Sequence, residues 1–152
     1  MGFGQLFSAT GISSSGLTAE RLRMEVAANN IANAHSTRSA DGGAFRRQQV
    51  VFSTAMDQLA GSSLPGSGSR IPAMGGVEVI GVIPDEAPLP KVLNPGHPDA
   101  DENGMVEMPN VALPTEMIDL MTANRAYEAN LKSLQTFRQM AEQALSLMRS
   151  NV

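Results

Sequence analysis

One stretch of the chain, Pro114 to Arg149, reads PTEMIDLMTANRAYEANLKSLQTFRQMAEQALSLMR. No proline follows its first residue, so no ring clash interrupts a helix there. Proline suits a first helical turn, Glu116 and Asp119 lie near the positive end of the helix dipole, and Arg149 lies near the negative end. The stretch therefore predicts one helix, roughly 50 Å long at 1.5 Å per residue.

Apolar residues in this stretch recur at the spacing of a coiled-coil seam. One seam position holds Met117, Asn124, Leu131, Arg138 and Leu145, and the other holds Leu120, Tyr127, Leu134, Ala141 and Met148. All except Asn124 and Arg138 can pack apolar surface, and a polar residue at such a position can set register at some cost in stability. The pattern predicts that this face of the helix packs against another helix.

Proline also divides the rest of the chain. All nine prolines of the 152 residues lie between Pro65 and Pro114, so long helices are possible only in the two flanks. In the first flank, residues 12–34 predict a helix about 35 Å long. Its two apolar faces consist of Ile12, Ser15, Ala19, Leu22, Val26, Asn29 and Asn33, and of Leu17, Met24, Ala28 and Ile31. Such a helix must bury one face against its own chain and one against something else, unless it is the central helix of a compact bundle.

The middle of the chain has the composition of strands and loops. Residues 45–52 end in β-formers and could form a short strand, and residues 76–83 predict one strand. Residues 61–69 are rich in Gly and Ser and predict a flexible stretch. Residues 85–107 carry six acids and one lysine, so we expect a local acidic patch on a loop or hairpin.

Composition excludes several classes of function. A net charge of −4 supplies no concentrated positive field for nucleic acid, and the absence of Cys removes thiol catalysis, thiolate zinc sites and disulfides. No run approaches the roughly 20 apolar residues of a membrane span, and the amino terminus lacks the regions of a cleaved signal peptide. Aromatic residues, at 4%, are too few to line a deep cavity for a small-molecule substrate. Charged residues are only 17%, and such weakly charged surfaces often face other subunits.

Few motifs carry chemistry. Residues 99–104, DADENG, match the opening of an EF-hand loop, but Asn110 stands where the loop needs a bidentate acid, so an Asx turn is favoured. His97 has only His35 as a second imidazole and is expected to bond nearby backbone in a turn. Arg46 and Arg47 form a basic pair that could meet the acidic stretch of a neighbouring subunit. We expect no catalytic residues, no metal and no cofactor.

The asparagines Asn29, Asn30 and Asn33 stand near the end of the first predicted helix, where their helix propensity is poor. Amides both donate and accept, so they can bond the backbone of an adjacent helix or end this helix. Two interpretations remain open, helix capping with local turn formation and a geometric joint between subunits.

Four segments carry a resemblance to a known family. Residues 15–34, SGLTAERLRMEVAANNIANA, and residues 116–130, EMIDLMTANRAYEAN, resemble the paired terminal motifs of bacterial flagellar rod and hook proteins. Residues 41–48, DGGAFRRQ, and residues 94–104, NPGHPDADENG, are similar to the proximal rod proteins of that family. Together the segments cover most of the chain.

The resemblance implies an α+β fold in three parts. The terminal helices, within residues 1–36 and 114–152, would pair as an antiparallel coiled coil, and residues 37–113 would form a small, β-rich and irregular outer region. The two helices would contact each other through apolar residues, and the asparagines would fix the helix end. The expected contact residues are Leu17, Leu22, Met24, Val26, Asn29, Asn30, Ile31, Asn33, Leu120, Tyr127, Leu131 and Leu134.

The resemblance also implies a function. The chain would be a structural subunit of the flagellar rod in the periplasm, not an enzyme, and would transmit torque through helical packing. Its partners would be other copies of itself, other rod proteins and the flagellar type III export apparatus, which needs no cleaved leader. Two alternatives remain: another axial protein with the same helices, and a small metal-binding or hydrolytic enzyme built on His97 and residues 99–101.

Overall fold

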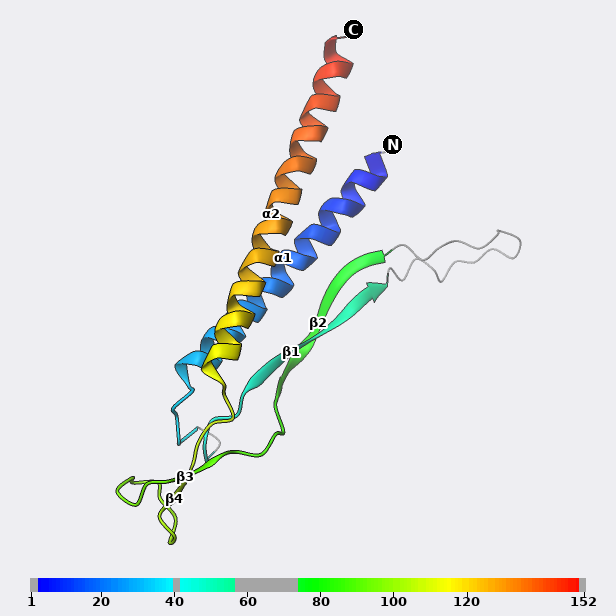
Figure 1. The fold of residues 1–152 in the computed structure, drawn as a ribbon. Coiled ribbons are helices and arrows are strands. Elements are labelled where there is room, and N and C mark those ends of the chain that lie inside the picture. The colour runs from blue at the N-terminus through cyan, green and yellow to red at the C-terminus, as the bar shows by residue number, and fades with distance from the viewer. Residues whose placement is uncertain (1–2, 40–41, 57–73, 151–152) are drawn as a thin grey trace, which may run out of the picture. The chain divides into compact units, whose positions relative to one another are not determined.

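The computed structural model describes residues 3–39, 42–56 and 74–150, with a helix at each end and strands between them (Figure 1). The order of elements is α1 (Phe3–Ala32), β1 (Gln48–Met56), β2 (Met74–Pro84), β3 (Lys91–Leu93), β4 (Met105–Glu107) and α2 (Leu113–Ser150). This arrangement confirms the α+β class. Coiled-coil pairing and the division into residues 1–36, 37–113 and 114–152 stay predictions. The expected flexible stretch at residues 61–69 lies outside the described residues.

Both long helices form where proline is absent. Helix α2 begins at Leu113 with Pro114 in its first turn and continues to Ser150, as the sequence predicts. Helix α1 begins at Phe3, nine residues before the predicted start at Ile12. The earlier start is tolerated because a glycine such as Gly11 costs a helix only about 1 kcal/mol, whereas a proline would end it.

The buried face of α2 differs from the predicted seam by one residue at one of its two heptad positions. The heptad position that holds Leu120, Tyr127, Leu134 and Ala141 is at least half-buried, as expected. The other predicted position is not, because Met117, Leu131 and Leu145 are exposed. The second covered position instead holds Glu116, Ala123, Asn130, Phe137 and Ala144. Most of these side chains are small or polar. The polar ones face the rest of the chain because specific partners lie against them there, while larger apolar side chains of α2 are exposed.

The chain falls into two compact units, each built from parts of both helices and of the strands. The first unit contains Met1–Arg21, Phe52–Ile80 and Arg125–Val152, and the second contains Leu22–Val51 and Gly81–Asn124. In the first unit α1 contacts both α2 and β2. Gly16 lies against the Asn130 side chain of α2, and the Val77 amide of β2 donates to the Ser15 hydroxyl at 3.1 Å.

The expectation that one face of α1 needs a partner outside its own chain stays a prediction. Leu17, Met24 and Ile31, on one of its two apolar faces, are all half-buried. Among the residues whose exposure is described, Ile12 is the one large apolar side chain of α1 that is exposed. The short strands beside α1 supply the second neighbour that a lone helix pair would lack.

The strands form two separate two-stranded sheets. Strand β1 pairs with β2, which confirms the strand expected at residues 76–83 and places the short strand at Gln48 to Met56. Strands β3 and β4 pair antiparallel with Val92 opposite Val106, so the acidic stretch is a hairpin. Gly104 adopts φ of 75° before β4, a left-handed conformation that glycine tolerates best.

The two helical glycines should respond differently to alanine. Gly11→Ala should raise the free energy of unfolding by about 0.5–1 kcal/mol, because nothing lies within 4 Å of the added carbon. Gly16→Ala should bring no gain, because its Cβ would lie 2.9 Å from Asn130 Nδ2 and displace that side chain. Urea unfolding of both variants measures the difference, and equal gains would show that α1 and α2 are not in close contact at Gly16.

Candidate functional site

A group of polar side chains meets in the second unit, where α1 ends, β1 begins and α2 begins. We call Asn30, Arg47, Glu116 and Asp119 the polar cluster. The Glu116 side chain is only 2% exposed and accepts hydrogen bonds from Arg47 Nε at 2.5 Å and from Asn30 Nδ2 at 2.8 Å. Asp119, one turn further along α2, pairs with Arg47 Nη2 at 3.3 Å. The buried carboxylate is therefore both neutralised and hydrogen-bonded, as burial of a charge requires.

Asn30 binds strand β1 as a neighbouring strand would. Its Nδ2 donates to the Gln48 carbonyl and its Oδ1 accepts from the Gln48 amide, each at 2.9 Å. With the bond to Glu116, three of the four hydrogen bonds that the amide can make are formed, and the residue is 1% exposed. One side chain thus ties the last turn of α1 to both β1 and α2.

Asn33 and Asn29 act differently from Asn30. Asn33 Nδ2 donates to the Asn29 carbonyl at 3.0 Å, and Asn33 Oδ1 accepts from the Ser36 hydroxyl at 3.2 Å. These bonds occupy backbone and side-chain groups at the helix end, so they fit the capping interpretation. Asn29 is exposed. A joint between subunits at these asparagines stays a prediction.

Arg47 faces three carboxylates of its own chain. Besides Glu116 and Asp119, Asp85 lies 3.8 Å from its guanidinium, and the Arg47 amide donates to Asn110 Oδ1 at 2.8 Å. Within its own chain Arg47 thus already meets Asp85 of the acidic stretch, and a contact of the basic pair with a neighbouring subunit stays a prediction. The Arg47 side chain is 21% exposed, so these pairs are partly shielded from water.

The predicted contact residues fall into three groups by exposure. Val26 and Asn30 are buried. The half-buried residues are Leu17, Leu22, Met24, Ile31, Asn33, Leu120, Tyr127 and Leu134. Asn29 and Leu131 are exposed. The roles of these residues in contacts between helices stay predictions.

The sequence reasoning missed Arg47, Glu116 and Asp119. Glu116 and Asp119 are acids at the positive end of a helix, which is a sufficient local explanation for both. The one available signal was opposite charge, since Arg47 belongs to a basic pair on a chain with an excess of acids. That signal does not say which acid pairs with which base.

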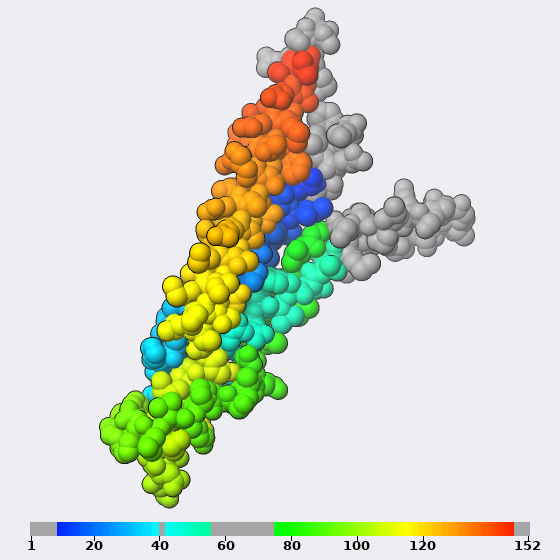
Figure 2. Space-filling model, viewed as in Figure 1, coloured from blue at the N-terminus to red at the C-terminus, as the bar shows by residue number. Residues whose placement is uncertain are grey.

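A second feature is the apolar surface that α2 leaves uncovered. Its exposed large apolar residues are Met117, Ile118, Met121, Leu131, Met140, Leu145 and Leu147. Figure 2 shows the surface of α2 open on the face in view, in yellow in the second unit and in orange in the first. These side chains are the apolar groups of α2 that a partner could cover, since contiguous exposed apolar surface marks contacts between macromolecules.

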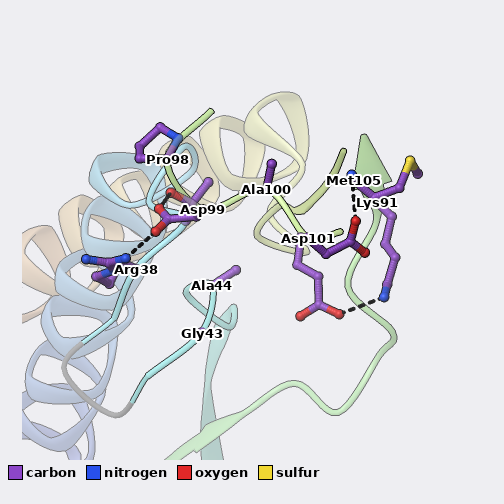
Figure 3. Close-up of a pocket in the computed structure, with 11 residues that line it drawn as sticks. Arg38, Gly43, Ala44, Lys91, Pro98, Asp99, Ala100, Asp101 and Met105 are labelled. Atoms are coloured by element: carbon purple, nitrogen blue, oxygen red, sulfur yellow. Dashed lines mark hydrogen bonds and ion pairs between the residues drawn. The ribbon is translucent and has the colours of Figure 1, made fainter. Parts of the chain in front are cut away.

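The second unit also has a pocket of about 400 Å³ beside the β3–β4 hairpin (Figure 3). Charged side chains in its lining already have partners. Asp99 accepts from Thr37 at 2.9 Å and pairs with Arg38, and Lys91 pairs with Glu107 at 3.1 Å. The pocket therefore presents paired charges rather than a reactive group.

The motif at residues 99–104 forms the expected Asx turn. Asp101 Oδ1 accepts from the amides of Asn103 at 2.8 Å and Met105 at 2.9 Å. His97 Nδ1 accepts from the Asp99 amide at 3.1 Å, which confirms its expected bond to nearby backbone. Within the described parts of the chain, no three His, Asp or Glu side chains are grouped so that they could hold a metal ion.

Asp99 should be the acid-sensitive residue of this hairpin. The hydrogen bond from Thr37, together with the charge of Arg38, lowers the pKa of Asp99 below its ordinary value. A lowered pKa in the folded state means that this stabilisation is present above the unfolded pKa and is lost as pH falls through the folded one. Thr37→Val should therefore raise the pKa of Asp99, which NMR titration of the carboxyl carbon measures. An unchanged titration would contradict the Thr37 contact.

Comparison with known proteins defines the class. The family model "Flagella basal body rod protein" matches residues 12–38, and "Flagellar basal body rod FlgEFG protein C-terminal" matches residues 102–147. The first region contains Asn30 and the second contains Glu116 and Asp119, so the polar cluster joins the two matched regions. The class is that of the flagellar basal-body rod proteins.

Curated relatives narrow the class further. A protein named flagellar basal-body rod protein FlgC from Borreliella burgdorferi is 39% identical, over 94% of this chain and 97% of its own length. Proteins of the same name from Salmonella typhimurium and Bacillus subtilis are 42% and 33% identical, and each match covers at least 90% of both chains. The chain belongs to the FlgC family.

Proposed function

We propose that this chain is a structural subunit of the proximal rod of the bacterial flagellum, assembled by packing of its terminal helices. Its family consists of structural components of the basal-body rod and is not a family of enzymes. The observation that carries the proposal is the exposed apolar surface of α2, because a rod subunit must bury such surface against its neighbours.

Burial of this surface would supply the energy of assembly. The seven exposed apolar side chains of α2 keep roughly half of their area in water. At about 25 cal/mol per Å², burying the exposed half of each side chain would stabilise the assembly by on the order of 1 kcal/mol. Several kcal/mol per interface, repeated at each subunit, can offset the loss of translational and rotational freedom on association.

The helix pair would act as the stiff element of the rod. In the second unit Arg23 meets Asp119 and Asn30 meets Glu116, so α1 and α2 run antiparallel where they touch. This direction supports an antiparallel coiled coil within each subunit. Repetition of one heterologous contact along an axis generates a helical array, and such an array transmits torque through contacts between subunits.

The proposal includes the partners and the location of the chain. Rod proteins assemble with other rod proteins, and the names of the relatives support a place in the basal body. We place the chain in the periplasmic rod and propose that the flagellar type III apparatus exports it. None of the helices in the described segments combines the length and hydropathy needed to cross a membrane.

The experiment is a deletion of the gene followed by electron microscopy of purified basal bodies. The deletion strain should lack the rod and should not swim, and the wild-type chain should restore both. Side-chain density in the restored basal body should show Met117 and Leu131 of α2 against another subunit. An intact rod in the deletion strain, or density for this chain beyond the proximal rod, would overturn the proposal.

A further inference from the structure

We propose that Asn30 and Glu116, held by Arg47, set the register between α1 and α2, so that only one turn of each helix can meet the other. The proposal concerns contacts inside one chain, in the second unit, and does not rest on assembly. A register is the axial offset at which two helices pack, and buried polar residues are known to select one offset among several.

The apolar residues of this part of the helix pair specify register weakly. The fully buried apolar side chains of the two helices here are Val26, Ala27 and Ala123, while Leu22, Met24, Ile31 and Leu120 are half-buried. A shift of α2 by seven residues, two turns, would place Tyr127 where Leu120 lies, so an apolar side chain would still fill that seam position. Packing alone therefore distinguishes poorly between the observed offset and its neighbours.

The polar residues, in contrast, tolerate one offset. Ala123 lies seven residues after Glu116, so the shifted register would place its methyl group opposite Asn30. The Asn30 amide would then lose its bond to Glu116, which is 2.8 Å long in the structure. A buried amide without its partner is strongly disfavoured relative to the paired state, so the shifted register is excluded.

Strand β1 adds a second constraint on the same side chain. Asn30 exchanges two hydrogen bonds with the Gln48 backbone, and the Arg47 side chain from the adjacent residue holds Glu116 at 2.5 Å. The start of β1 therefore binds α1 through Asn30 and α2 through Glu116. The same contacts thus select both the register of α1 against α2 and the position of β1.

The test measures the offset directly. The chain contains no cysteine, so cysteines introduced by Ala28→Cys and Ile118→Cys give a clean pair for spin labels. Both residues are exposed, and both belong to the second unit. Electron–electron double resonance on the dilute monomer then reports the distance between the labels, and a slip of seven residues moves one label axially by about 10 Å.

The labelled wild-type chain should show one narrow distance. The variant Asn30→Leu/Glu116→Leu should keep its helical circular dichroism, because apolar residues often replace buried polar groups without loss of stability and Arg47 retains Asp119. It should nevertheless show a second, longer distance, because the slip moves one label about 10 Å along the helix axis, away from its position level with the other label. The matched control Asn29→Leu/Glu142→Leu changes an exposed asparagine and an exposed acid, and should keep the single distance.

Three outcomes would overturn the proposal. The first is a broad distribution in the wild-type chain, and the second is a single unchanged distance in Asn30→Leu/Glu116→Leu. If that variant does not fold, Asn30→Ala/Glu116→Ala replaces it, since alanine is the strongest helix former. The third outcome is that the leucine and the alanine double variants both fail to fold, because Asn30 and Glu116 would then supply stability rather than register.

Discussion

Arg47→Met should lower the free energy of unfolding by about 3 to 5 kcal/mol, the usual cost of removing one partner from a buried ion pair. The loss arises because the carboxylate of Glu116, only 2% exposed, would be left buried without its cation. Asp119 and Asp85 would lose the same partner. Chemical denaturation followed by circular dichroism measures the change.

Its neighbour Arg46 provides the matched control. Arg46 is exposed, and its guanidinium lies 3.3–3.4 Å from the carbonyl oxygens of Ala87 and Asp85. Arg46→Met should therefore change the stability by no more than about 0.5 kcal/mol. Adding Glu116→Leu to Arg47→Met should recover part of the loss, because it removes the unpaired charge. Similar losses in the two arginine variants would contradict the role of the polar cluster.

Leu131→Asp should abolish swimming while the subunit still folds. Leu131 is 41% exposed, so its replacement removes little packing within the chain, and the stability should fall by no more than about 1 kcal/mol. In the assembled rod, by contrast, the carboxylate would enter an apolar contact between subunits, where an unpaired charge is strongly disfavoured. Swimming in soft agar and electron microscopy of basal bodies measure the effect.

Ser133→Asp tests whether position rather than charge matters. Ser133 is exposed on the same helix, and its hydroxyl bonds the Ala129 carbonyl of its own turn. This variant adds the same charge at an exposed position that is already polar, and it should swim nearly as well as the wild type. Normal swimming of the Leu131→Asp strain would count against the proposed contact surface of α2.

The long helices and the class of protein could be predicted from the sequence because their signals are local. Proline excludes helix wherever it stands, so its confinement to the middle of the chain shows where α1 and α2 can form. The paired terminal motifs at residues 15–34 and 116–130 then indicate the family. The hairpin at residues 85–107 and the Asx turn of Asp101 follow from turn chemistry within a few residues.

The covered face of α2 could be predicted only in part. A heptad pattern ranks positions by hydrophobicity, and it selects Met117 and Leu131 over Glu116 and Asn130. In the structure Glu116 and Asn130 are covered instead, because Asn30 and Arg47 bind Glu116, and Gly16 leaves room for Asn130. No property of α2 alone indicates that such partners exist.

Local sequence is enough to predict the two helices, the strand-bearing middle and the family. Each of these depends on residue types and on spacings that are read within one segment. The tertiary contacts, in contrast, set which face of α2 is buried and which is exposed. That choice depends on Arg47 and Glu116, which lie 69 residues apart, and a charge pair across that separation has no trace in local periodicity.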